Sequence, residues 1–225
     1  MAKGRKKSTL SKAQMRQVRK IAEDVVDEEI EDKQFVTTYE NVQLYHNKPG
    51  YAQKFLQELQ IGGDSGGQST GATGSKVVRI GRQISLKNIN IRMWLSNKLD
   101  RPNVMYKGVL FWYPVGQAAT DALVFKTQTN KMLDRYNRND IRIVDQFIVK
   151  STNNYAVDAN NHEHSYLATL NKSYKNKKIT YDELTGQVKG WDLGFCVVCY
   201  DAYGTLQTDN IASFAWQSVI TFQDA

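Results

Sequence analysis

The chain has 225 residues, 41% of them hydrophobic, which is enough for one domain with a sizeable core plus an appendage. Its formal net charge of +7 and pI near 9.2 favour a polyanionic partner or a membrane surface. No apolar run approaches the roughly 20 residues of a membrane-spanning helix, and the N-terminus lacks the apolar core of a secretory signal, so we expect a soluble protein made in a reducing compartment.

The first 32 residues carry charges of opposite sign in two separate blocks. Residues 21–32 hold seven acidic residues and no basic one, whereas residues 1–20 hold eight basic residues and no acidic one. The basic residues are Lys3, Arg5, Lys6, Lys7, Lys12, Arg16, Arg19 and Lys20. With little aromatic content and no stacking platform, this block suits sequence-tolerant, salt-dependent contact with phosphates. A solvated tail and a nuclear import signal in GRKK are the alternatives.

The same segment has the pattern of an amphipathic helix. Apolar residues from Val18 to Ile30 recur at helical spacing, and Ser11 with Gln14 has the form of a capping box, which places the helix start near Lys12. A helix of about 21 residues follows, roughly 30 Å long. Its segregated charges oppose the helix dipole, so we expect partners outside the helix to offset that cost.

From Gln34 onward the hydrophobic period is two, which predicts an all-β body over 34–225 after an arm and helix over 1–33. The expected strands cover residues 34–45, 84–95, 104–114, 140–150, 164–170, 177–184, 191–200 and 211–222. In the segment 84–95 the aliphatic residues occupy even-numbered positions up to Leu86 and odd-numbered positions from Ile89 onward. One extra residue would restore a single inward face, which predicts a β-bulge near Lys87 and Asn88. Segments 108–114 and 195–200 are apolar on both faces, as in central strands covered by a second sheet or a neighbouring subunit.

Residues 61–75, IGGDSGGQSTGATGS, are too rich in Gly, Ser and Thr to pack a core and predict a surface loop. A phosphate-binding P-loop needs Gly-Lys-Ser/Thr between a strand and a helix. Here Gly74 is followed by Ser75 and Lys76, and a strand comes next, so the sequence argues against nucleotide binding.

Catalytic chemistry finds little support in the sequence. Cys196 and Cys199 lie three apart on an expected strand and so point to opposite faces, which predicts two buried free thiols. His162 and His164, in NHEHS, resemble a cupin metal motif, but no acidic residue follows at the required spacing and no later histidine exists. We therefore expect a non-enzyme and interpret NHEHS as a polar strand edge or loop.

The order of these parts resembles that of small single jelly-roll capsid proteins. MRQVRKI, the acidic block and DKQF are similar to the arm of satellite tobacco necrosis virus-type coat proteins. GSKVVRIGRQISLKNINIRMWL, residues 74–95, resembles the Arg-Ile-Gly segment of capsids of circular, Rep-encoding single-stranded DNA viruses. VLFWYP and the closing VITFQDA fit the same pattern. The resemblance covers nearly the whole chain.

This resemblance implies an eight-stranded antiparallel jelly-roll sandwich with a basic arm and amphipathic helix inside a T=1 icosahedral shell of about 60 copies. The chain would then be located in the virion, assemble in the host nucleus or cytoplasm, and package a single-stranded genome, DNA in our interpretation. The family's three-fold helix bundle would involve Val18, Ile21, Val25 and Val26. Its calcium ligands between subunits would correspond to Glu31 and Asp224, for which plain surface carboxylates are the alternative.

Three other functions stay open at this point. A satellite-type single-stranded RNA virus could use the same coat, because phosphate contacts hardly distinguish RNA from DNA. A lectin-like β-sandwich binding module would favour an exposed aromatic groove, and a cupin-type enzyme would need a bound metal. Neither a lectin nor a cupin requires eight early bases followed by a helix.

Overall fold

A computed structural model describes residues 11–29, 32–59, 72–74, 79–101, 103–150, 165–201, 206 and 208–224, with backbone only for 23, 24, 26–29 and 72–74. The chain divides into two compact units, Met1–Asp32 and Lys33–Ala225. The first contains helix α1, Lys12–Glu29, and the second contains all of the strands found among these residues.

Helix α1 begins with the expected capping box. The Ser11 backbone N–H donates to Gln14 Oε1 at 2.9 Å, and the Gln14 N–H donates to Ser11 Oγ at 3.2 Å. These reciprocal bonds satisfy two backbone donors that a helix N-terminus otherwise leaves unpaired. The predicted start of the helix is therefore confirmed at the level of individual hydrogen bonds.

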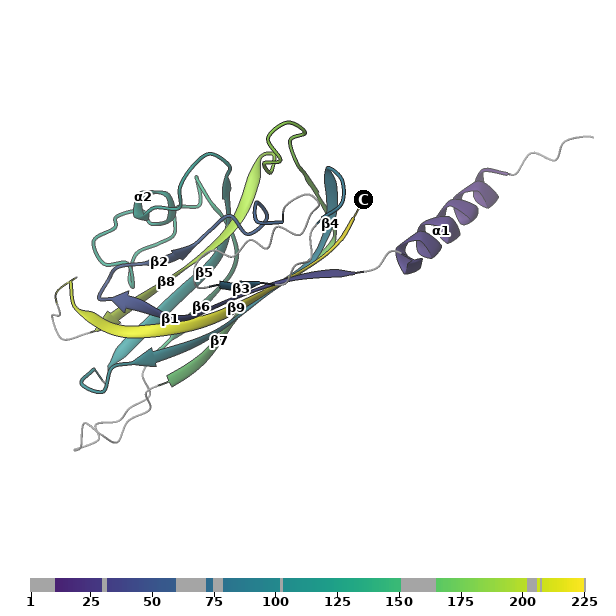
Figure 1. Cartoon of the computed structure of the whole chain (residues 1–225). Helices are drawn as coiled ribbons and strands as arrows, with labels where there is room; N and C mark the ends of the chain where they lie inside the picture. The colour runs from purple at the N-terminus through teal and green to yellow at the C-terminus, as the bar shows by residue number, and fades with distance from the viewer. Residues whose placement is uncertain are drawn as a thin grey trace, which may run out of the picture. The chain divides into compact units, whose positions relative to one another are not determined.

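The second unit is a sandwich of two antiparallel sheets (Figure 1). The five-stranded sheet has the order β3-β1-β9-β4-β7 and the four-stranded sheet β2-β8-β5-β6. The strands are β1 Lys33–Tyr45, β2 Gly50–Ala52, β3 Ala72–Gly74, β4 Gln83–Asn97, β5 Val104–Pro114, β6 Arg142–Val149, β7 Ser165–Thr180, β8 Trp191–Asp201 and β9 Asn210–Asp224, with helix α2, Asp121–Val124, between β5 and β6.

Strand pairing in this sandwich is nested. Apart from the short β3, the first strand pairs with the last, β2 with β8, β4 with β7, and β5 with β6, all antiparallel. A long hairpin that folds over on itself produces this pairing pattern, and the pattern defines the eight-stranded jelly roll. The predicted fold class is thus confirmed by strand order alone.

Two sequence expectations about individual strands were wrong. Segments 164–170 and 177–184 form one strand, β7, which pairs along β4 from Ser165 to Thr180 and ends before 181–184. Its middle is exposed at the sheet edge and bulges opposite Lys87, with Asn176 at a φ of 54°, so the alternation that marks a strand is lost there. Strands β2 and β3 have three residues each, too few for a periodic signal, and β3 occupies part of the expected 61–75 loop.

The bulge predicted in β4 is present. The register of β4 against both neighbours shifts between Leu86 and Asn88. Six apolar side chains on either side of the shift are all buried: Ile84, Leu86, Ile89, Ile91, Met93 and Leu95. One extra residue restores a single inward face, because each added residue reverses the side-chain direction on a strand.

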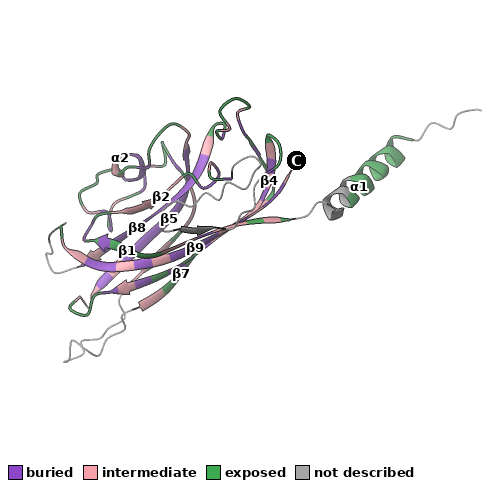
Figure 2. Ribbon diagram, in the orientation of Figure 1, coloured by how far each residue is buried: buried purple, intermediate pink, exposed green. Residues whose placement is uncertain are grey.

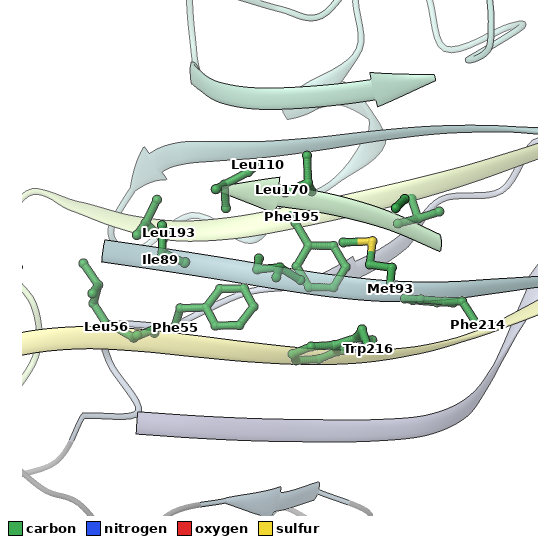
Figure 3. Packing of buried hydrophobic residues seen from close by; sticks show 14 of the residues in the cluster. Phe55, Leu56, Ile89, Met93, Leu110, Leu170, Leu193, Phe195, Phe214 and Trp216 are labelled. Carbon is green, nitrogen blue, oxygen red and sulfur yellow. The ribbon is translucent and has the colours of Figure 1, made fainter. Parts of the chain in front are cut away.

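The main core lies between the two sheets. Figure 3 shows the rings of Phe55, Phe195 and Trp216 together in this space. The Phe195 centroid lies 5.0 Å from that of Trp216 and 5.7 Å from that of Phe55. Such edge-to-face and offset ring pairs add to the stabilisation from burial.

A second core covers the outer face of the four-stranded sheet. Phe111 and Val198 from β5 and β8 pack there against Leu123, Phe125 and Tyr136 of the 115–141 connection, which contains α2. Figure 2 shows β5 and β8 buried along their length. These strands are central as expected, but a third layer from the same chain covers them, in addition to the second sheet.

Candidate nucleic-acid and subunit interfaces

The described half of the basic arm lies on one face of α1. With 3.6 residues per turn, Lys12, Arg16, Arg19 and Lys20 share a face, and all four are exposed. Lys3, Arg5, Lys6 and Lys7 lie outside the described residues. The helix thus presents a short row of cations at its N-terminal half, a geometry suited to a phosphate backbone.

The roughly opposite face of α1 is apolar and exposed. Val18 is 54% exposed, Ile21 61% and Val25 46%, while the side chain of Val26 is not described. Met15, 53% exposed, extends the same stripe. Apolar side chains at i, i+3 and i+7 are the pattern by which helices pack against one another. Association of these helices in an assembly stays a prediction.

The candidate calcium ligand Asp224 is engaged with donors. The Lys33 ammonium forms an ion pair with Oδ2, and the Ile80 backbone N–H donates to Oδ1 at 2.8 Å. Calcium takes six to eight oxygen ligands, and the described residues contain no cluster of three or more metal-ligating side chains. In this structure the Asp224 carboxylate is engaged by these two donors, and its calcium role stays a prediction. Since Glu31 is not described, its calcium role stays a prediction.

Arg79, in the Arg-Ile-Gly segment, is a buried clamp that the sequence analysis did not identify. It is 1% exposed and donates to the backbone oxygens of Leu59 at 2.7 Å, Gly186 at 3.3 Å and Gly81. Its guanidinium lies 3.6 Å from the Tyr181 ring centroid. Burial lowers the pKa of Arg79, and electrostatic interactions with Tyr181 and Asp224 oppose this shift. The motif thus ties three loops together at one end of the body.

The two cysteines behave as the sequence predicts. Both are buried free thiols, with Cys199 in the inter-sheet core and Cys196 in the second core. Burial raises the pKa of Cys196 far above its ordinary value and that of Cys199 to about 12. Thiols in this state are poor nucleophiles at neutral pH.

Of the histidines, only His46 lies within the described residues. It is 5% exposed, and its Nδ1 accepts a hydrogen bond from the Asp201 backbone N–H at 3.1 Å. Burial lowers its pKa, with Asp201 and Asp209 opposing the shift. His46 therefore has a structural role at the end of β8, while His162 and His164 of NHEHS lie outside the described residues.

An aromatic hollow opens between β1 and β2. Tyr39 and Tyr51 line it above a floor that includes Phe55 and Trp216. Glu58 also lines the hollow, and partial burial together with the nearby Asp192 raises its pKa to about 7. Aromatic and carboxylic groups in a hollow are the feature that a lectin-like function would use.

The two sheets differ in charge. The strands of the five-stranded sheet carry seven basic residues, Lys33, Lys87, Arg92, Lys172, Lys175, Lys177 and Lys178, against Glu40 and Asp224. Those of the four-stranded sheet carry Lys107 and Arg142 against Asp145, Asp192 and Asp201. The strands of the five-stranded sheet therefore carry the greater excess of basic residues.

The body belongs by its strand nesting to the jelly rolls, a fold found in viral capsid, lectin and cupin domains. The sequence matches no protein-family model and no curated protein. A solved structure of Desmodium yellow mottle tymovirus is similar over 87% of this chain and 88% of that chain, with a TM-score of 0.35 and 9% identity. So distant a likeness carries no argument, and the fold assignment depends on the strand order.

Within the described part of the chain, no helix is long and apolar enough to cross a membrane.

Proposed function

We propose that this chain is the coat subunit of a small icosahedral virus. It assembles with copies of itself into a closed T=1 shell of about 60 subunits and packages a single-stranded genome, DNA in our proposal, through its basic arm. The observation that carries the proposal is the joining of a jelly-roll body to a helix whose basic and apolar faces are both exposed. A helix with an exposed basic face and an exposed apolar face can meet two kinds of partner, a polyanion and other apolar surfaces.

Each part has a definite place in the proposed virion. The basic face of α1 contacts packaged phosphates without reading sequence, and Val18, Ile21 and Val25 contact helices of neighbouring subunits. The Lys33–Asp224 ion pair joins the first and last strands where the arm enters the body. The arm therefore links genome to shell, and no catalytic step is involved.

Electron microscopy of the expressed full-length chain tests the shell. We expect uniform closed particles, because identical subunits with closed point-group symmetry give one size. A stable monomer at high protein concentration and low salt would overturn the proposal. A variant with Val18→Asp and Val25→Asp should assemble poorly, whereas Leu184→Asp, at a 96% exposed turn residue, is the matched control and should assemble normally.

Nucleic-acid content tests the packaging arm. Replacing the eight basic residues of the arm with glutamine, in the full-length chain, should remove most co-purifying nucleic acid while the urea midpoint of the body is unchanged. In binding experiments the salt slope should fall by about 0.7 for each lost phosphate contact. Nucleic-acid content equal to the wild type would contradict the arm's role. Digestion of the packaged material with DNase or RNase decides between a DNA genome and the RNA alternative.

The aromatic hollow at Tyr39 and Tyr51 keeps a lectin-like module as the second candidate. Aromatic faces bind apolar faces of sugar rings, and a nearby carboxylate accepts hydroxyl hydrogen bonds. Titration of the full-length chain with neutral oligosaccharides, with Tyr51→Ala for comparison, tests this function. Saturable binding that the variant loses would favour the lectin.

A further inference from the structure

An exposed tryptophan lies on the outer face of the basic five-stranded sheet. Trp94 of β4 is 57% exposed and is in register with Leu167 of β7, 84% exposed, and with Ala215 of β9. Two positions along β4, Arg92 is in register with Thr169 and Gln217, and Gln217 pairs in turn with Thr38 of β1. These residues and Glu40 line one shallow depression.

The indole of Trp94 is available to a ligand. Trp112 and Trp216 are 7% and 6% exposed and belong to the inter-sheet core. By contrast, no aromatic ring among the described residues stacks on Trp94, and its strand neighbour Ala215 is small. A large apolar ring held open on a flat sheet is an unusual surface feature, because most tryptophans are largely buried.

The polar side chains around Trp94 favour a charged ligand. Arg92 is exposed and, in the described part of the chain, makes no ion pair, so its guanidinium can meet a phosphate. It lies on the same face as Trp94 and roughly 7 Å away along the strand, because side chains alternate on a strand. Glu40 is the single acidic residue that lines the depression, and its charge repels phosphate. A phosphate is therefore expected near Arg92 and away from Glu40.

The charge of the whole sheet distinguishes between possible occupants. Lys33 is paired with Asp224 and Lys177 lies over the ring of Trp112, so five of the seven basic residues on its strands, against Glu40, are left to attract a polyanion. A second copy of the chain docking by the same face would bring like charges together, and such self-complementary contacts are disfavoured by that repulsion. An uncharged sugar would gain nothing from the basic surroundings.

We propose that this face binds single-stranded nucleic acid, with a base stacked on the indole of Trp94 and a backbone phosphate at Arg92. The inference rests on the proposed packaging function and adds a second contact to it, on the body and not on the arm. Stacking on an aromatic side chain tolerates any base, since every base has a π face. Alternation along β4 places Trp94 on the face opposite Met93 and Leu95, but it does not reveal whether anything covers the indole.

Anisotropy of a labelled oligothymidylate with the full-length chain tests the site. Trp94→Ala should weaken binding about 5- to 150-fold, the range for loss of one base–aromatic stack, while Trp94→Phe should keep most of the affinity. Ile148→Ala is the matched control, since it removes a similarly exposed apolar side chain, 59% exposed, from the four-stranded sheet. It should bind as the wild type does.

Salt and an abasic oligomer separate stacking from charge. Trp94→Ala should leave the slope of log K against log salt unchanged, whereas Arg92→Gln should reduce it by about 0.7. With an abasic oligodeoxyribose phosphate of equal length, wild type and Trp94→Ala should bind equally. A Trp94→Ala variant that binds both oligomers as the wild type does overturns the proposal.

Two further outcomes distinguish the test of the Trp94 site from the test of the basic arm. If the eight-glutamine arm variant loses binding while Trp94→Ala does not, the base site is refuted and the packaging arm is supported. If Trp94→Ala stops shell assembly in sedimentation but leaves oligothymidylate affinity unchanged, the face contacts another subunit and the proposal fails. Urea unfolding verifies that each variant is folded.

Discussion

Lys107 of β5 offers a test of what holds the third layer onto the four-stranded sheet. It is 6% exposed, and its ammonium donates to the backbone oxygens of Lys131 at 3.1 Å, Met132 at 3.4 Å and Asp134. The same ammonium lies 4.5 Å from the centroid of the Tyr136 ring. One buried cation therefore organises a stretch of the 115–141 connection that has little regular structure of its own.

Lys107→Met keeps the length of the side chain and removes the ammonium. The contacts to Lys131 and Met132 are buried, and a buried acceptor left without its donor costs about 1–3 kcal/mol. Burial of the charged ammonium carries a desolvation cost, which is why the pKa of Lys107 is lowered. Methionine avoids this cost, and that offsets part of the loss. We expect a net destabilisation of about 2–3 kcal/mol.

Urea unfolding measures this effect, with the slope m unchanged and the midpoint lowered. Lys172→Met, at an exposed position of β7, is the matched control and should change the free energy of unfolding by less than about 0.5 kcal/mol. A Lys107→Met variant as stable as the wild type would refute the reasoning. In that case apolar contacts alone hold the connection in place.

Three more predictions follow from the body. Burial raises the pKa of Asp192 to about 6, so the folded state binds this proton more tightly than the unfolded state does, and stability should fall by about 2 kcal/mol as pH rises from 4 to 7. Asp192→Asn should lack this contribution, and an identical pH profile of unfolding in both proteins would contradict it. Deleting Lys87 removes the β4 bulge and turns half of the strand's apolar residues outward, so circular dichroism should find no folded protein. In Gly108→Ala the new methyl would lie 2.2 Å from the Phe147 ring, and we expect urea unfolding to report a loss of about 1–3 kcal/mol; an unchanged midpoint would mean that the ring moves freely.

Residue spacing was enough to predict the features that depend on neighbours along the chain. The capping box at Ser11 and Gln14 uses groups three residues apart, and the bulge at Lys87 follows from the parity of its own strand. The burial of Cys196 and Cys199 in cores on opposite faces of β8 follows from the same alternation. Each of these is set by backbone geometry within one element, which is why residue spacing predicted them.

What covers each face of a strand could be learned only from the folded chain. Periodicity reports which side chains share a face of a strand, but not whether a sheet, a loop or solvent lies against it. The apolar outer side of β8 is covered by the 115–141 connection, and the equally apolar Trp94 on β4 is left in solvent. Arg79 is likewise a cation by sequence but is buried in the structure, because it donates to the carbonyls of Leu59 and Gly186, which come from two distant loops, as well as to that of nearby Gly81. Burial depends on contacts between residues that are far apart in the chain, and only folding brings these residues together.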